Sequence, residues 1–172
     1  ISPITPARPG FDAVYKVVYK NKGNIAISGN VTLSFDDSRL DLVDAIPTAD
    51  NSITDNLTWN YSNLKPFESR SIEIRFNANT PTEIPALNNG DILTFTAVIA
   101  PISGDELPAD NTFLYHQTVV GSYDPNDITC IEGETVSPTE IGNYLHYAVN
   151  FENTGTYQAE NIVVRNTIDT NK

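Results

Sequence analysis

The chain has 172 residues, 40% of them apolar, and a formal net charge of −12. That apolar share is enough for a hydrophobic core, so a wholly disordered chain is excluded. The negative charge argues against nucleic acid as a partner, because Lys and Arg must neutralise phosphates. No apolar run approaches the ~20 residues of a membrane-spanning helix, so we expect no membrane insertion. A single cysteine, Cys130, excludes an internal disulfide and a zinc–cysteine site.

Short stretches in which apolar and polar residues alternate follow one another along residues 10–120, after a lead-in at residues 1–9 that carries three prolines. This two-residue period is typical of half-buried strands. About seven such stretches, separated by turn residues, predict an antiparallel β-sandwich of immunoglobulin-like architecture over residues 1–120. The apolar members are Tyr15, Val17 and Tyr19; Val31, Leu33 and Phe35; Leu40 and Leu42; Leu57, Trp59 and Tyr61; Ile72, Ile74 and Phe76; Leu93, Phe95, Ala97 and Ile99; Phe113, Tyr115 and Val119.

The first of these stretches recurs 132 residues later, since residues 10–23 and 142–155 share Gly, Tyr, Val, aromatic, Asn and Gly at matching places. A repeat of this length indicates whole domains. We therefore expect a junction at residues 121–127, then the N-terminal part of a second immunoglobulin-like sandwich at residues 128–172.

This second domain is expected to contain a short strand near 128–131, a helix start at 137–140, and strands at about 144–152 and 161–168. So few strands cannot bury a complete sandwich core. Either the domain continues in a longer protein, as the absence of methionine also suggests, or another chain supplies the missing strands. The remaining expected partners are neighbouring domains of the same polypeptide.

The segment Gly121-Ser122-Tyr123-Asp124-Pro125-Asn126-Asp127, followed by Tyr144-Leu145-His146-Tyr147 and Phe151-Glu152-Asn153-Thr154-Gly155, resembles a known repeat family. It is similar to the β-sandwich repeat domains that precede the C-terminal sorting domain in Bacteroidetes cell-surface proteins exported by type IX secretion. Residues 121–172 carry the resemblance, whereas residues 10–120 share only a general strand pattern. The resemblance implies a secreted or cell-surface protein, such as an adhesin or a carrier of enzyme domains, and no activity for this stretch.

Three oxygen-bearing side chains, those of Asp124, Asn126 and Asp127, lie within four residues at the junction. Calcium takes six to eight oxygen ligands from such groups, so the segment is a candidate calcium site that would stiffen the junction. The alternative is a plain type I turn, which Asp-Pro-Asn-Asp also favours.

Catalytic motifs are missing from the sequence. Neither His116 nor His146 has a nucleophile at a recognisable spacing, and Cys130 has no basic neighbour. We therefore expect no enzyme, and a stalk or spacer module as the first hypothesis. The alternatives are an accessory domain of an enzyme, or a carbohydrate- or protein-binding module with a platform around Tyr19, Trp59 or Tyr61. Trp59 is otherwise expected to fill the core.

Overall fold

The computed structural model describes residues 1–102, 105–122, 126–133, 135–140, 142–160, 162–165 and 167, with the backbone alone for residue 126. The chain divides into two compact units, Ile1–Val120 and Gly121–Lys172. Among the described residues, the helical segments are two short 3-10 turns, and none is long and apolar enough to cross a membrane.

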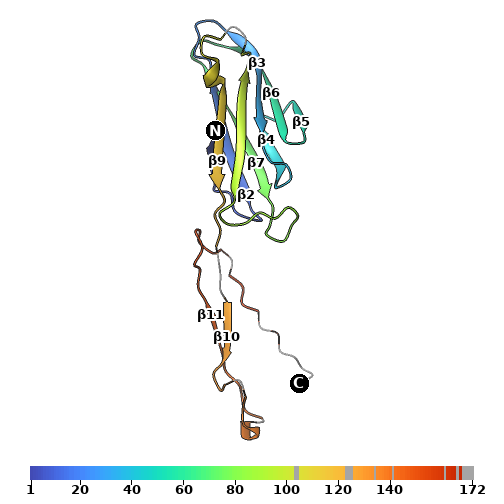
Figure 1. Cartoon of the computed structure of the whole chain (residues 1–172), viewed down its shortest axis with the longest axis vertical. Coiled ribbons are helices and arrows are strands. Elements are labelled where there is room, and N and C mark those ends of the chain that lie inside the picture. Colours follow the sequence, from blue (N-terminus) through green and yellow to red (C-terminus); the bar gives the residue numbers. More distant parts are fainter. Residues whose placement is uncertain are drawn as a thin grey trace. The chain divides into compact units, whose positions relative to one another are not determined.

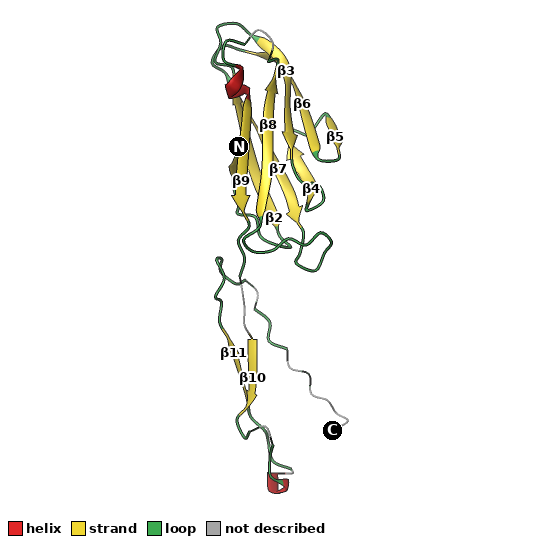
Figure 2. Cartoon of the chain, in the orientation of Figure 1, coloured by secondary structure: helices red, strands yellow, loops and turns green. Residues whose placement is uncertain are grey.

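The described residues of the first unit form two antiparallel sheets (Figures 1 and 2). The four-stranded sheet has the order β1-β2-β7-β4, and the five-stranded sheet has the order β5-β6-β3-β8-β9. Except for β1 to β2, β5 to β6 and β8 to β9, each connection crosses from one sheet to the other. This all-β, immunoglobulin-like sandwich confirms the predicted fold class. The elements are β1 (Ser2–Pro3), β2 (Asp12–Lys20), β3 (Ile27–Ser34), β4 (Leu40–Ile46), β5 (Asn51–Ile53), β6 (Asn56–Leu64), β7 (Ser69–Ala78), β8 (Ile92–Ala100), η1 (Pro108–Asn111) and β9 (Thr112–Thr118).

The core lies between the two sheets and consists of the residues that alternate in the sequence. The Tyr15 ring of β2 packs 4.6 Å from the Phe95 ring of β8, and Phe76 of β7 packs 4.6 Å from Phe35. Since these rings come from both sheets, their packing holds the layers together. Burying one large apolar side chain stabilises a fold by roughly 1.5–3 kcal/mol. The strand residues buried here include Val17, Val31, Leu33, Leu57, Trp59, Tyr61, Ile72, Ile74 and Leu93.

The proline-containing lead-in is part of the sandwich. Its strand β1 pairs with β2, with Pro3 opposite Tyr15. Further along, Ala7 is fully buried and its carbonyl accepts a hydrogen bond of 3.0 Å from the Val120 amide. Proline has no amide donor and is tolerated in an edge strand such as β1. The sequence predicts the extended conformation of this segment but gives no sign of its pairing.

The residues that follow β1 and β10 donate backbone hydrogen bonds to equivalent places in the two copies of the repeated strand. The Ile4 amide donates to the Val14 carbonyl over 2.7 Å, and the Ile131 amide donates to the His146 carbonyl over 2.8 Å. Val14 and His146 occupy equivalent places in the two copies of the repeat. In both copies, the preceding strand therefore pairs with the same edge of the repeated strand.

The Asn-x-Gly turn that follows the repeated strand is also built the same way twice. The Asn21 side chain accepts from the Gly23 amide at 2.9 Å and donates to the Ile25 carbonyl at 2.7 Å. Its counterpart Asn153 accepts from the Gly155 amide at 3.0 Å and donates to the Tyr157 carbonyl at 2.6 Å. An asparagine side chain that bonds the backbone beyond it replaces part of a turn's own hydrogen bonding.

In the second unit the described residues form β10 (Asn126–Cys130), η2 (Pro138–Glu140) and β11 (Tyr147–Phe151). The two strands pair antiparallel, with Ile128 opposite Val149. The helix start predicted at 137–140 is therefore a 3-10 turn, and the strand predicted at 144–152 is shorter than expected.

The strand predicted at 161–168 is wrong for the residues that the structure describes there, because residues 162–165 and 167 lie in no strand. A strand needs a neighbouring strand that hydrogen-bonds its backbone N–H and C=O groups. The described residues of this segment have no such neighbour, and the side chain of Val163 is largely exposed to solvent.

Candidate functional site

The calcium candidate at the junction falls mostly outside the described residues, since Asp124 and the side chain of Asn126 are not among them. Asp127 is described and lies exposed in β10, where its carboxylate accepts a 3.3 Å hydrogen bond from the Thr129 hydroxyl. Within the described residues, no three acidic, His or Cys side chains are grouped as metal ligands. Calcium at Asp124, Asn126 and Asp127 remains a prediction.

A cluster that the sequence does not reveal joins Glu132 to Cys130 and His146. The Glu132 carboxylate accepts from the His146 ring Nδ1 at 2.6 Å, from the His146 backbone amide at 2.9 Å and from the Cys130 thiol at 3.4 Å. The side-chain hydrogen bond from His146, together with that from its amide, lowers the pKa of Glu132 to about 2. Glu132 lies 14 residues from His146, a spacing that matches no recognised motif.

This cluster links the end of β10 to the residue before β11 through the Glu132 carboxylate. A reactive thiol needs a cationic neighbour or a base, whereas the half-buried Cys130 thiol donates to a carboxylate. The contact between His146 and Glu132 uses the ring Nδ1, and no hydrogen bond joins the imidazole to the Cys130 thiol among the described residues.

The other histidine, His116, lies exposed in β9 with its Nδ1 3.0 Å from the Thr94 hydroxyl of β8. A hydroxyl and an imidazole act as nucleophile and base when a third side chain orients the imidazole ring and hydrogen-bond donors form an oxyanion hole nearby. Thr94 and His116 instead face each other across two strands on an open sheet surface, which is the arrangement of a stabilising cross-strand pair.

The aromatic side chains considered for sugar stacking belong to the core. Trp59 is 3% exposed and its indole N–H donates to the Pro47 carbonyl at 2.8 Å, which confirms the core interpretation. Tyr61 is buried as well, with its hydroxyl donating to the Ala100 carbonyl at 2.6 Å. Tyr19, half-buried, packs its ring 5.5 Å from that of Tyr61. A platform at Trp59 or Tyr61 is therefore excluded, because neither ring presents a face to solvent.

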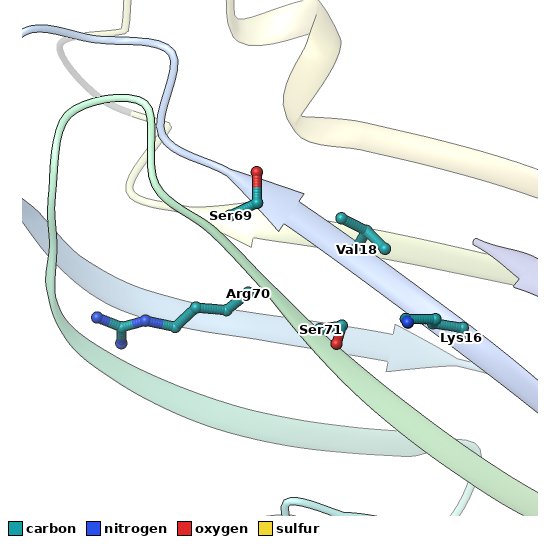
Figure 3. Close-up of a pocket in the computed structure, with 5 residues that line it drawn as sticks. All are labelled: Lys16, Val18, Ser69, Arg70 and Ser71. Carbon is teal, nitrogen blue, oxygen red and sulfur yellow. The ribbon is translucent and has the colours of Figure 1, made fainter.

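A shallow hollow lies on the outer surface of β2 and β7, lined by Lys16, Val18, Ser69, Arg70 and Ser71. Figure 3 shows that the Arg70 guanidinium lies away from Lys16 and Ser71. It is held by the Glu68 carboxylate at 2.8 Å and by two backbone carbonyls. One ammonium and two serine hydroxyls on an open surface provide a weak contact for an anion and no enclosed ligand site.

Residues 124–172 match a protein family described as a domain of unknown function (DUF7619). No curated protein matches the chain. The family match covers the part of the chain that holds β10, β11 and the Glu132–His146 pair.

Proposed function

We propose that the chain is a non-catalytic stalk or spacer module of a large secreted or cell-surface bacterial protein, in which it positions other domains. The extracellular location rests on the resemblance of residues 121–127 and 144–155 to repeats of type IX-secreted surface proteins. Its immediate partners are then neighbouring domains of the same polypeptide.

The observation that supports a spacer is that a strand contact and a turn of the first sandwich recur in the second unit. The contact between Ile131 and His146 repeats that between Ile4 and Val14, and the Asn153 turn repeats the Asn21 turn. Tandem sandwiches of one type extend a polypeptide by adding domains and need no chemistry of their own.

The alternative of a carbohydrate-binding module is weakened by the burial of Trp59 and Tyr61. A protein-binding module or an accessory domain of an enzyme remains compatible with a sandwich whose outer faces are free. These alternatives differ from a spacer in one testable respect, because they require particular surface residues and a spacer does not.

A domain replacement in the gene that carries this chain tests the proposal. Residues 1–120, the whole first unit, are exchanged for an unrelated immunoglobulin-like sandwich of the same length, and cell adhesion and protease accessibility of the neighbouring domains are measured. A spacer predicts that both are retained, whereas a flexible Gly/Ser linker of equal length reduces them. Loss of adhesion with the well-folded replacement contradicts the proposal and favours a binding module.

A further inference from the structure

We propose that the free edge of β9, in the first sandwich, pairs antiparallel with the β9 edge of a second copy of the chain. This goes beyond a spacer role, because it gives the module a lateral contact between neighbouring copies. The edge belongs to the first unit, whose two sheets enclose a core of their own.

The four edge strands of this sandwich differ in how well they resist pairing with another chain. β1 has two residues, one of them Pro3, and β5 has three. β4 has a register shift between Leu42 and Asp44 and a further exposed carboxylate at Asp41. Short length, proline, bulges and charged side chains are the usual devices that keep an edge strand from pairing. β9 has seven residues in an unbroken register with β8 and shows none of these devices.

The backbone hydrogen bonds at the end of β9 show which of its groups are free. The Val119 amide donates over 2.8 Å to the Asp91 carbonyl, on the β8 side. The next amide, that of Val120, donates over 3.0 Å to the Ala7 carbonyl of the N-terminal lead-in. Alternate residues of a strand face the same neighbour, so odd-numbered residues of β9 bond to β8 and even-numbered ones face outward. The outward N–H and C=O groups, with which no described strand pairs, belong to Thr112, Leu114, His116 and Thr118.

Two large apolar side chains lie exposed along this edge, Phe113 at 52% and Leu114 at 55%. A twofold axis at Leu114 sets this residue opposite its own copy, and sets Phe113 of each chain opposite Tyr115 of the other. The side chains of directly opposite residues adjoin, and aromatic or apolar pairs of this kind stabilise a sheet. Both exposed residues therefore gain an apolar partner in this register.

The neighbouring registers serve these residues less well. With the axis one residue earlier, Leu114 lies opposite Thr112. With the axis one residue later, Phe113 lies opposite Gln117, and with the axis two residues later, Leu114 lies opposite Thr118. The edge is thus complementary to itself in one register, which assigns a second copy of the chain as its partner.

The distribution of charge also favours contact at this edge. Two copies with a formal net charge of −12 each repel one another. Asp110, the acidic residue nearest to β9 in the sequence, is paired with Lys22 at 2.8 Å. β9 itself has no acidic residue, and pairing it with a second β9 brings no two carboxylates face to face. The adjoining residues on the outer surface of β8 are also uncharged; they are Ile92, Thr94, Thr96 and Val98.

The test is the association state of the full chain, followed by sedimentation velocity and NMR from ~10 μM to ~1 mM. The contact is smaller than a standard protein–protein interface, so we expect a weak dimer that dissociates on dilution. The amides of Leu114 and His116 should gain protection from solvent exchange as the dimer forms. Those of Phe113 and Tyr115 already bond to β8 and should not change.

Variants at the axis identify the surface. Leu114→Lys places two like charges opposite each other and abolishes the dimer up to ~1 mM. Leu114→Glu does the same alone, but an equimolar mixture of the two variants restores association, since opposite charges then face each other. The matched control is Ile92→Lys, at a side chain with 56% exposure on β8, which is not an edge strand. This control retains the dimer.

A chain that stays monomeric at ~1 mM overturns the proposal. A dimer that Leu114→Lys leaves intact also overturns it, because another surface, such as the exposed strands of the second unit, then forms the contact. Equal loss of the dimer in Ile92→Lys, or a mixture of the two Leu114 variants that remains monomeric, has the same consequence.

Discussion

Two tyrosines of the first sandwich differ in whether their buried hydroxyls are paired. Tyr15 is fully buried, and its hydroxyl makes no hydrogen bond within the described part of the chain. Burial, reinforced by the nearby Tyr115, raises the pKa of Tyr15. The Tyr61 hydroxyl instead donates to the Ala100 carbonyl. An unpaired buried hydroxyl destabilises a fold, whereas a paired one contributes a net hydrogen bond.

Tyr15→Phe is therefore expected to raise the free energy of unfolding of residues 1–120 by about 1 kcal/mol, and Tyr61→Phe to lower it by about 1 kcal/mol. Urea denaturation at neutral pH measures both changes. A raised folded-state pKa gives stability that is present below pH ~10 and is lost as the pH rises further. The Tyr15→Phe variant should accordingly lose stability less steeply above pH ~10, and destabilisation at neutral pH would contradict the interpretation.

A second residue-scale prediction concerns Glu132. Its carboxyl should titrate with a pKa of about 2, followed through the side-chain carbon by NMR. Because the pKa is lowered, the stability that this carboxylate gives is present above pH ~4.3 and is lost as the pH falls toward ~2. His146→Ala should raise the pKa of Glu132, since the His146 side chain contributes the largest part of the shift.

The control for this titration is Glu83, whose pKa is lowered by the Thr80 backbone amide in the first unit. His146→Ala should leave Glu83 unchanged. An unaltered Glu132 titration in the variant would show that the imidazole does not hold the carboxylate.

At the scale of single elements, β3 depends on a glycine. The register of β3 against β6 shifts between Ile27 and Gly29, and a Cβ atom at Gly29 would lie 1.9 Å from the Ala100 carbonyl oxygen. That oxygen belongs to the backbone of the adjacent β8 and cannot rotate away. The close approach of the two strands therefore requires glycine at this position.

Gly29→Ala is expected to destabilise the first sandwich by about 2–3 kcal/mol, because the overlap must displace backbone. The comparison is Gly90→Ala, where no atom lies within 4 Å but φ is +92°. That change should cost about 1–2 kcal/mol from the backbone conformation alone. Thermal denaturation of residues 1–120 ranks the two variants. Equal destabilisation would mean that β3 and β8 separate enough to accommodate the added methyl group at little cost.

Most strands of the first unit are predictable from sequence, because apolar and polar residues alternate along them and the apolar residues indicate the side that faces the core. The pairing of β1 is not, since its hydrogen bonds depend on a strand ten residues further along. Phe113 is exposed although it alternates with the half-buried Tyr115, because it lies near the start of an edge strand. The Glu132–His146 pair likewise follows from the turn that brings β10 to β11, and no local pattern signals it.

At the scale of the whole molecule, the two units differ in how completely they bury apolar residues. The first has a core contributed by both sheets, whereas Tyr147, Val149 and Phe151 of the second unit are exposed. We therefore expect residues 1–120 to fold alone and residues 121–172 not to fold alone, because two strands do not close a core. NMR amide dispersion of the two separate pieces decides this, and a well-dispersed spectrum of the shorter piece would refute it.

The final prediction is that calcium binds at the junction. The chain carries a net charge of −12, and Asp124, Asn126 and Asp127 concentrate oxygen ligands in one short segment. Three side chains cannot fill six to eight positions, so backbone carbonyls, water or a further carboxylate must complete the site. Titration of the full chain with calcium should shift the Asp127 and Thr129 amides and saturate with a Kd of ~10⁻⁴ M, within the range of extracellular sites.

Asp127→Ala should abolish these calcium-dependent shifts, whereas Glu140→Ala, which removes an acidic residue outside the segment, should leave them intact. Magnesium should substitute poorly, because it requires a tighter octahedron and gives up its water reluctantly. Binding to the folded state alone stabilises it by about 2.7 kcal/mol at a hundredfold excess of calcium over Kd. If calcium at ~10 mM, a hundredfold excess over that Kd, leaves both amides unmoved, the segment binds no calcium and Asp127 is only an exposed residue of β10.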